Sequence, residues 1–230
     1  MLSPWPMWWG IAFLSGSIPF GVILAKLHGI DLRSVGSGNV GATNVGRALG
    51  RRWGIFCFVL DALKGSVPVL LAGTFTGALG TPIVHMTSAM TWGWTCMVAA
   101  AVLGHVFCPW IGFNGGKGVA TGFGCMIAMW PVLTWAALLA LLTWIVSMKL
   151  TRIVSLSSLI SAALMPVWCA VTLPWPVNGE PGTPLRPMAL TGLIALAVML
   201  AHRANISRLV AGTEPCVGKK KTTNPDSIGS

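Results

Sequence analysis

Two short polar stretches carry most of the residues of this chain that could do chemistry. Residues 36–47 read Gly-Ser-Gly-Asn-Val-Gly-Ala-Thr-Asn-Val-Gly-Arg, and residues 115–122 read Gly-Gly-Lys-Gly-Val-Ala-Thr-Gly. Glycines let a backbone approach a ligand closely, Ser, Asn and Thr supply hydrogen-bond donors, and Arg and Lys bind anions. Both stretches therefore indicate binding of a phosphate or a similar anion.

The first polar stretch matches a nucleotide-binding pattern only in part. Gly36, Gly38 and Gly41 fit G-x-G-x-x-G, but that dinucleotide fingerprint needs a preceding β-strand within a βαβ unit. The residues before it here are apolar over a length that predicts a membrane span. What remains is a loop whose backbone N–H groups can surround a phosphate. An ordinary flexible linker is the alternative, and the density of polar side chains disfavours it.

The second polar stretch is not a Walker A loop, because Ile111 stands where that motif begins with glycine and Lys117 is followed by Gly118. Lys117 precedes a short apolar segment, so its ammonium and the N-terminus of the next helix both favour an anion there. Gly118 and Gly122 also match G-x-x-x-G, a pattern typical of helix packing in membranes. Both interpretations can hold together.

Four further polar residues are candidates for the same site. His105 precedes the glycine pair of the second stretch by ten residues, and it is either structural or a participant in the reaction. Ser155 begins an apolar segment, where serines usually bond back to the helix, and binding of phosphate is its alternative role. His202 and Asn205 lie three residues apart on one helix face. They indicate either ligand binding or a basic juxtamembrane helix.

Carboxylates are scarce, with five Asp and Glu residues in the chain. They are not paired as glycoside hydrolysis requires, and no His, Cys or Asp cluster has the spacing of a metal site. Asp61 and Lys64 lie three residues apart inside an apolar segment, and we expect them to form an ion pair that supports the site. The six cysteines are scattered, which favours structural free thiols that face lipid or the core over disulfides or metal ligands.

The elements that must position these residues are membrane-spanning helices. The chain of 230 residues is 54% hydrophobic and 9% charged, whereas soluble domains are roughly 25% charged. Several segments stay apolar over the ~20 residues that cross ~30 Å of hydrocarbon. We expect an all-α, polytopic membrane protein with about seven transmembrane helices, at residues 5–27, 53–74, 90–109, 117–131, 132–150, 153–173 and 186–202.

The basic residues predict how these helices are oriented. Seven spans place the two termini on opposite sides, and with the N-terminus outside, 12 of the 15 Lys and Arg residues fall in cytoplasmic loops or in the tail. Such a bias is the positive-inside pattern. We therefore expect the C-terminus and both polar stretches on the cytoplasmic side. A membrane surface then accounts for the net charge of +10, and no nucleic-acid partner is expected.

The chain is expected to form a single integral-membrane domain over residues 1–214. Residues 174–187 are rich in Pro and Gly and predict a turn-rich connector on the outer side. Residues 215–230 predict a polar, disordered cytoplasmic tail. The Lys219–Lys221 run in this tail suits contact with anionic lipid headgroups, worth about 1 kcal/mol per basic residue, although a solvated tail is an equal alternative.

Five motifs of the chain belong together: residues 36–47, Leu103-Gly-His105, residues 115–121, Ser155-Leu-Ser-Ser158 and His202-Arg-Ala-Asn-Ile-Ser-Arg-Leu209. Together they closely resemble those of the bacterial acylphosphate-dependent glycerol-3-phosphate acyltransferases of PlsY type. The resemblance runs from about Phe13 to Glu214 in the right order. The first motif is long enough to be highly specific.

The resemblance implies a multi-pass enzyme of the bacterial cytoplasmic (inner) membrane, with its active site facing the cytoplasm. Such an enzyme transfers a fatty acyl group from acyl phosphate to the 1-position of sn-glycerol 3-phosphate, giving lysophosphatidic acid and phosphate in phospholipid biosynthesis. The implied partners are these two substrates and membrane lipids, with no cofactor and no metal. None of the four histidines begins the H-x-x-x-x-D motif of the thioester-using acyltransferases.

The residues suit the chemistry that the resemblance implies. An acyl phosphate is a mixed anhydride with a good leaving group, so the site has mainly to align two anionic substrates and offset their repulsion. We expect the acyl phosphate to be held by Ser37, Asn39, Thr43, Asn44, Gly116 and Ser155. We expect the glycerol phosphate to be held by Arg47, Lys117, His202 and Asn205. The expected catalytic residues are Ser37, Arg47, Lys117 and His105, and the base is either His105 or a phosphate oxygen of the donor.

Two other classes of protein remain as alternatives. An organophosphate or phosphate transporter also binds anions with Arg and Lys, but typically near the bilayer midplane and between repeated halves. Here the polar motifs gather on one predicted face of the membrane, and no internal repeat is apparent in the sequence. A lipid-binding scaffold without chemistry is the third hypothesis. The sequence predicts neither the oligomeric state nor the acyl-chain preference.

Overall fold

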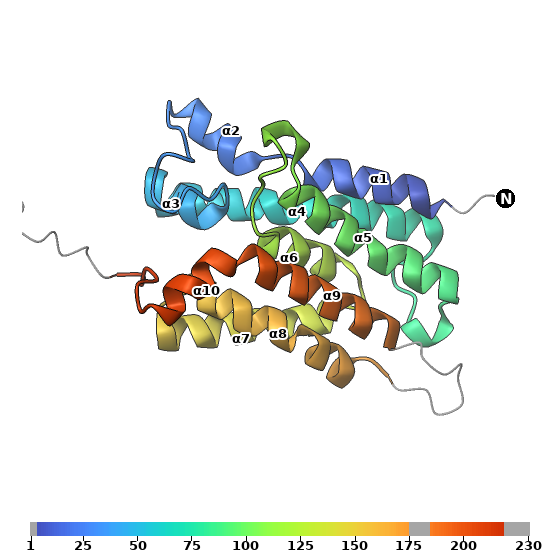
Figure 1. Ribbon diagram of the computed structural model, residues 1–230. Coiled ribbons are helices and arrows are strands. Elements are labelled where there is room, and N and C mark those ends of the chain that lie inside the picture. The colour runs from blue at the N-terminus through green and yellow to red at the C-terminus, as the bar shows by residue number, and fades with distance from the viewer. Residues whose placement is uncertain (1–3, 175–184, 219–230) are drawn as a thin grey trace, which may run out of the picture.

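The structure is a computed structural model that describes residues 4–174 and 185–218, and over these ranges it consists of helices without β-strands. Figure 1 shows the long helices running side by side in one bundle, with the start of α1 at one end and α10 at the other. The all-α class predicted from the sequence is therefore confirmed.

The bundle is built from ten α-helices and two 3-10 turns within the described ranges. The N-terminal part contains α1 (Trp5–Gly16), α2 (Phe20–Leu27), α3 (Ala42–Leu49), α4 (Arg51–Thr76), η1 (Ile83–His85) and α5 (Ser88–Val106). The C-terminal part contains η2 (Pro109–Ile111), α6 (Val119–Ala128), α7 (Thr134–Thr151), α8 (Val154–Thr172), α9 (Leu185–Ala201) and α10 (Arg203–Val210). The closest pairings are α1 with α5, α4 with α6, and α7 with α8.

Long apolar helices account for five or six membrane spans in the part of the chain that is described. The five are Trp5–Leu27, Arg51–Thr76, Ser88–Ile111, Thr134–Thr151 and Val154–Thr172, and α9 with α10 adds a sixth if this pair, bent by 64°, is one span. The predicted count of seven is not confirmed. The expected span at 117–131 is α6, which has 10 residues and rises only about 15 Å at 1.5 Å per residue.

The first predicted span, at residues 5–27, is interrupted between α1 and α2. Pro19 lies at the break, and a proline lacks the backbone N–H that a continuous helix needs at that position. The buried Lys64 ammonium donates a hydrogen bond to the carbonyl oxygen of Ile18 at 2.7 Å. The break thus leaves a backbone carbonyl next to a charged side chain of α4.

The short helix α6 is held against α4 by glycines. A Cβ at Gly65 of α4 would lie 2.4 Å from the carbonyl oxygen of Thr121, and one at Gly124 of α6 would lie 2.0 Å from that of Ala62. Small residues allow two backbones to approach this closely, as is common where membrane helices pack. The boundary expected at Pro131 is confirmed, because α6 ends and α7 begins on either side of it.

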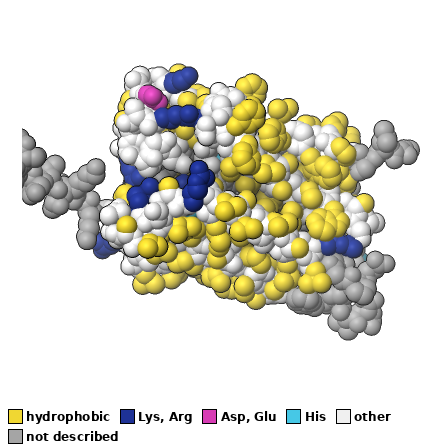
Figure 2. All heavy atoms as spheres, viewed as in Figure 1, with side chains coloured by type: hydrophobic (Ala, Val, Ile, Leu, Met, Phe, Trp, Pro, Cys, Tyr) yellow, Lys and Arg dark blue, Asp and Glu magenta, His cyan; other side chains and the backbone are white. Residues whose placement is uncertain are grey.

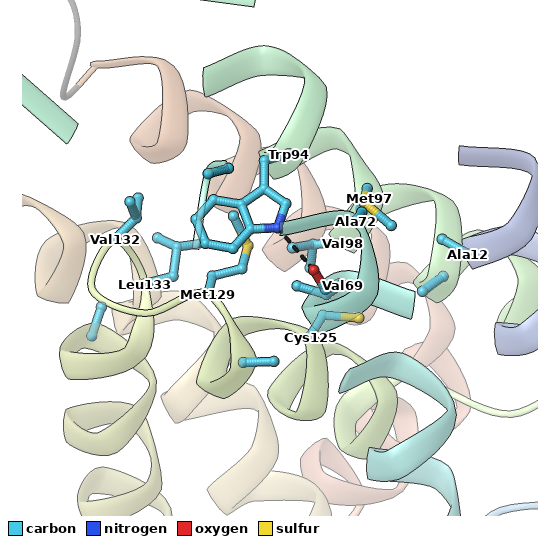
Figure 3. Packing of buried hydrophobic residues seen from close by; sticks show 14 of the residues in the cluster. Ala12, Val69, Ala72, Trp94, Met97, Val98, Cys125, Met129, Val132 and Leu133 are labelled. Carbon is cyan, nitrogen blue, oxygen red and sulfur yellow. Dashed lines mark hydrogen bonds between the residues drawn. The ribbon is translucent and has the colours of Figure 1, made fainter. Parts of the chain in front are cut away.

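The apolar half of the bundle packs around Trp94 of α5, which is fully buried (Figure 3). Its indole Nε1 donates a hydrogen bond to the carbonyl oxygen of Val69 at 3.1 Å, and Met97, Met129 and Leu133 are buried in the same cluster. On the surface, many large apolar side chains are exposed over the body of the bundle (Figure 2). Exposed apolar surface of this extent is typical of helices that face lipid.

Basic side chains gather mainly at the end of the bundle where α3 and α10 lie (Figures 1 and 2). The described chain continues past α10 as far as Gly218, and the backbone N–H of Val217 donates to the carbonyl oxygen of Arg152 at 2.8 Å. Most of the predicted connector at 174–187, and the tail from residue 219 onward with its lysine run, lie outside the described residues.

Candidate functional site

A cavity with about 860 Å³ of empty volume, including its open mouth, lies among the polar loops at this end of the bundle. Its walls come from the loop before α3, from α3, α4, the end of α5, the start of α6, α7, α8 and the α10 region. All the predicted site residues except Gly116 line it: Ser37, Asn39, Thr43, Asn44, Arg47, His105, Lys117, Ser155, His202 and Asn205. Motifs that are far apart in the sequence thus share one cavity.

Asn44 holds the first polar stretch in shape. Its side-chain Nδ2 donates to the carbonyl oxygens of Leu32 and Val35, both at 3.0 Å, and its Oδ1 accepts from the backbone N–H of Ser37 at 3.0 Å. Gly36 has a φ of +60°, and a Cβ there would lie 2.3 Å from Asn44 Oδ1. Only glycine fits this position. The Asn44 amide therefore organises the loop, and its described hydrogen bonds are all internal to it.

The other residues of the first stretch present polar groups to the cavity. Asn39 Oδ1 accepts from the backbone N–H of Gly41 at 2.9 Å, which fixes the turn into α3. Thr43 and Arg47 follow in α3, four positions apart and on one helix face. Both are exposed and both line the cavity. The loop and the helix thus combine to place a guanidinium beside hydroxyl and amide groups.

A second group of cavity residues is joined through the carboxylate of Glu214. Its Oε1 accepts from Ser155 Oγ at 2.7 Å and from Asn205 Nδ2 at 2.6 Å, and its Oε2 accepts from Arg208 Nε at 2.7 Å. Lys117 Nζ in turn donates to Asn205 Oδ1. One chain of hydrogen bonds therefore connects the second polar stretch with α8 and α10.

The charges in this group have shifted proton affinities. Burial lowers the pKa of Lys117 to about 8; the nearby Glu214 carboxylate opposes this shift, and the positive charges of Arg208 and Arg47 add to it. Burial raises the pKa of Glu214, but the hydrogen bonds from its three donors outweigh burial and hold the pKa below its ordinary value. At neutral pH the carboxylate is ionised, and Lys117 is a cation close to its titration range.

His202 lies at the break between α9 and α10 and is 2% exposed. Its Nδ1 is 2.7 Å from the carbonyl oxygen of Val198. Because a carbonyl only accepts, Nδ1 carries the hydrogen of this bond. The backbone N–H of Asn205 donates to the carbonyl oxygen of His202 at 2.8 Å, so the two predicted residues share the first turn of α10.

His105 lies deeper, among buried polar groups. Its Nδ1 is 3.2 Å from Thr121 Oγ1 and 3.9 Å from Asp61 Oδ1. Asp61 Oδ1 is 2.7 Å from Lys64 Nζ, and both side chains are buried. The ion pair expected between Asp61 and Lys64 is thus present, and it stands directly behind the histidine.

Gly116 differs from the other predicted residues, because it does not line the main cavity. A Cβ at this position would lie 2.1 Å from His105 Nε2. Gly116 instead borders a second cavity with about 210 Å³ of empty volume, which His105, Asp61 and Lys64 also line. The imidazole and the ion pair therefore separate the two cavities.

Among the lining residues of the main cavity that the sequence does not single out as site residues, Glu214, Phe58 and Trp144 bear most on its chemistry. Glu214 was noted only as a scarce carboxylate at the end of the resemblance, and its position after a basic helix could have suggested a partner for Arg208. Phe58 of α4 and Trp144 of α7 supply an apolar wall, with Trp144 Nε1 donating to Ser158 Oγ at 3.2 Å. Their types alone give no signal in a chain so rich in apolar residues.

Comparison with known proteins gives one consistent family. The family model described as glycerol-3-phosphate acyltransferase matches residues 7–212. A protein of that name from Anaeromyxobacter dehalogenans (strain 2CP-1 / ATCC BAA-258) is 46% identical over 207 residues, which are 88% of this chain and 92% of the relative. Another from Aquifex aeolicus (strain VF5) is 39% identical over 203 residues, covering 88% and 94%.

Solved structures give the same result. The glycerol 3-phosphate form of PlsY (YgiH), an integral membrane glycerol 3-phosphate acyltransferase, matches with a TM-score of 0.79 and 38% identity over 94% of this chain and 96% of that one. Its lysophosphatidic acid form matches with a TM-score of 0.77 and 36% identity over the same shares. The chain therefore belongs to the glycerol-3-phosphate acyltransferase family and is an integral membrane protein of PlsY type.

Proposed function

We propose that this protein transfers a fatty acyl group from acyl phosphate to the 1-position of sn-glycerol 3-phosphate, releasing lysophosphatidic acid and phosphate. The observation that carries the proposal is the shared cavity, in which Arg47, Lys117 and Asn205 from three separate motifs lie together. The family adds support, because PlsY has a glycerol 3-phosphate form and a lysophosphatidic acid form.

The charge balance of the cavity suits two phosphate-bearing substrates. Each of its two carboxylates is already paired with a cation, Asp61 with Lys64 and Glu214 with Arg208. Over the described ranges, Arg47 has no ion pair with a carboxylate, and Lys117 is bonded to the neutral amide of Asn205. Two cations are thus left to offset the repulsion between two phosphates. This repulsion becomes stronger when water is excluded, because the effective dielectric constant falls.

The substrates are assigned to the walls by their chemistry. Arg47, Lys117, His202 and Asn205 hold the phosphate of the acceptor. Ser37, Asn39, Thr43 and Ser155 hold the phosphate of the donor, and Asn44 keeps their loop in shape. The apolar wall of Phe58 and Trp144 suits the start of the acyl chain, and since Phe58 is 38% exposed, this wall continues toward the lipid-facing surface.

The reaction exchanges one acyl–oxygen bond for another. The 1-hydroxyl oxygen of glycerol 3-phosphate attacks the acyl carbon, the bond from that carbon to the phosphate oxygen breaks, and the hydroxyl proton leaves on the released phosphate. Of the two candidate bases, a phosphate oxygen of the donor is favoured over His105, because Nδ1 of His105 faces Thr121 and Asp61 and its Nε2 lies against Gly116. Alignment of the reactants then supplies most of the acceleration, an effect worth up to roughly 7–11 kcal/mol.

We also infer that the cavity faces the cytoplasm of the bacterial inner membrane. The bias of Lys and Arg toward the loops at this end supports that orientation. The start of α1 lies at the end of the bundle opposite α10 (Figure 1), which fits seven passes with α6 as a short one.

Purified protein in detergent tests the function. With acyl phosphate and glycerol 3-phosphate together it should release phosphate and form lysophosphatidic acid, and omission of either substrate should abolish the product. The family match favours the enzyme over the transporter alternative. Uptake of glycerol 3-phosphate into liposomes without product formation would instead favour the transporter.

A further inference from the structure

We propose that His105 is a positioning residue: its imidazole, braced by Thr121 and Asp61, supports the Gly115–Gly116 turn and so sets the place of Lys117. The expected effect on KM for glycerol 3-phosphate rests on the proposed function, in which Lys117 binds the acceptor phosphate. In this proposal His105 orients the site and does not act as the base.

The contact between the ring and the turn is direct. The three atoms nearest to a Cβ built on Gly116 all belong to the imidazole: Nε2 at 2.1 Å, Cε1 at 3.0 Å and Cδ2 at 3.1 Å. The backbone N–H of Gly116 also donates to the carbonyl oxygen of His105 at 3.2 Å, and that of Gly115 donates to Val106 at 2.9 Å. The turn therefore lies on both the side chain and the backbone of the last turn of α5.

The other side of the ring is braced by buried polar groups. Nδ1 lies 3.2 Å from Thr121 Oγ1 on α6 and 3.9 Å from Asp61 Oδ1 on α4. Lys64 holds that carboxylate oxygen at 2.7 Å and also bonds the carbonyl oxygen of Ile18 at 2.7 Å. A carboxylate beside Nδ1 favours the form of the ring with hydrogen on that atom. The ring is thus fixed in orientation by three helices.

The turn is connected directly to the cation of the site. Lys117 follows Gly116 in the chain, and its ammonium reaches Asn205 across 88 positions of sequence. Since α6 begins two residues after Lys117, the short segment between the turn and the helix cannot absorb a large displacement. Movement of the turn must move Lys117 away from Asn205, which should weaken binding of the acceptor phosphate and leave the attack itself intact.

The structure offers a size-exchange test of this contact. Gly116→Ala places a methyl group where the imidazole stands, and His105→Ala removes the imidazole. We expect Gly116→Ala to raise KM for glycerol 3-phosphate about tenfold or more with kcat within about threefold of the parent, a split that reports lost binding. The double variant Gly116→Ala/His105→Ala should recover a large part of this loss, because neighbouring residues that share a contact are not additive.

Gly115→Ala is the matched control. A Cβ at Gly115 would lie 1.9 Å from the backbone oxygen of His105, an atom that His105→Ala retains. Its defect should therefore persist in the Gly115→Ala/His105→Ala double variant. If the effects of Gly116→Ala and His105→Ala instead multiply, or if His105→Ala lowers kcat with KM unchanged, the positioning role is wrong.

Thr121→Val gives a milder probe in case Gly116→Ala does not fold. It removes the hydroxyl beside Nδ1 but keeps the shape of the side chain, and it should raise KM for glycerol 3-phosphate with kcat retained. Thr95→Val is its control, because Thr95 Oγ1 is also buried and bonds the carbonyl oxygen of Thr91 within α5, at 2.6 Å. An unchanged KM in Thr121→Val, or an equal rise in Thr95→Val, would contradict the proposal.

The thermal unfolding midpoints of the same variants separate this inference from the proposed function. If the parent protein forms no lysophosphatidic acid, the proposed reaction is wrong. The contact between His105 and Gly116 is then tested by the unfolding midpoints alone. Gly116→Ala should lower the midpoint, and His105→Ala should restore it in the double variant. Simple addition of the two shifts would overturn the inference, whatever the activity.

Discussion

Lys117 donates a hydrogen bond to Asn205, which joins the loop before α6 to α10 across 88 positions of sequence. Asn205 is held in turn by Glu214 at 2.6 Å. Two motifs that the sequence presents separately therefore form one wall of the cavity, with a cation and an amide side by side. The first four predictions concern this wall and the polar stretch at residues 36–47.

The rate at low acceptor concentration should fall at alkaline pH. Burial lowers the pKa of Lys117 to about 8, and only the protonated ammonium attracts a phosphate. In a plot of kcat/KM for glycerol 3-phosphate, which reports groups of the free enzyme, activity should decline above about pH 8. Lys149→Ala, a change at an exposed lysine of α7, should keep this decline, and Lys117→Arg should remove it. A profile that stays flat through pH 9 would contradict the assignment.

Arg47→Gln should lower kcat/KM for glycerol 3-phosphate by about 10- to 100-fold, because charged hydrogen bonds to a phosphate are worth about 1.5–3 kcal/mol. The guanidinium has no carboxylate partner within the described chain that would mask its loss. Arg51→Gln is the control, since Arg51 is exposed at the start of α4 and does not line the cavity. Equal kcat/KM values in the two variants would contradict the assignment of Arg47 to the acceptor phosphate.

Glu214→Ala should destabilise the fold by about 1–3 kcal/mol, because Ser155, Asn205 and Arg208 lose their common acceptor. Glu214→Gln keeps an acceptor oxygen and should lose less. Since the folded pKa of Glu214 is lowered, its stabilisation is present at neutral pH and is lost as the pH falls through that pKa. Unfolding midpoints measured from pH 7 into the acid range should therefore converge for parent and Glu214→Gln. Parallel curves would show that Glu214 contributes no charge effect.

Gly36→Ala should impair activity more than Gly29→Ala. Both glycines have a positive φ, of +60° and +69°, so alanine is strained at either position by roughly 1–2 kcal/mol. Only at Gly36 does the added Cβ also meet Asn44 Oδ1, at 2.3 Å, whereas at Gly29 no atom of the described residues beyond its chain neighbours lies within 4 Å. The difference between the two variants isolates the hydrogen-bonded loop. Similar losses of kcat/KM in both variants would mean that activity does not depend on the hydrogen bonds between the Asn44 side chain and its loop.

Sequence patterns predicted the helical class and most of the polar residues that line the cavity, because glycine-rich polar motifs stand out against apolar helices. They could not show that the Asn44 amide is used within its own loop, since residue type does not reveal which polar atoms are already satisfied. The predicted span at residues 5–27 is confirmed in length and composition, but it is two helices, α1 and α2, with Pro19 between them. A full span was also predicted where α6 has 10 residues. Pro19 accounts for the break between α1 and α2. The close packing of α6 on α4 is a tertiary contact, and such contacts leave little trace in local composition.

The most direct test of the account is phosphate release by purified protein supplied with acyl phosphate, with and without glycerol 3-phosphate. The account predicts release that depends on both substrates, matches lysophosphatidic acid mole for mole, and falls at least about tenfold in kcat/KM when Arg47 or Lys117 is replaced by a neutral residue. Release that is independent of glycerol 3-phosphate, or that persists at the parent rate in both variants, would contradict it.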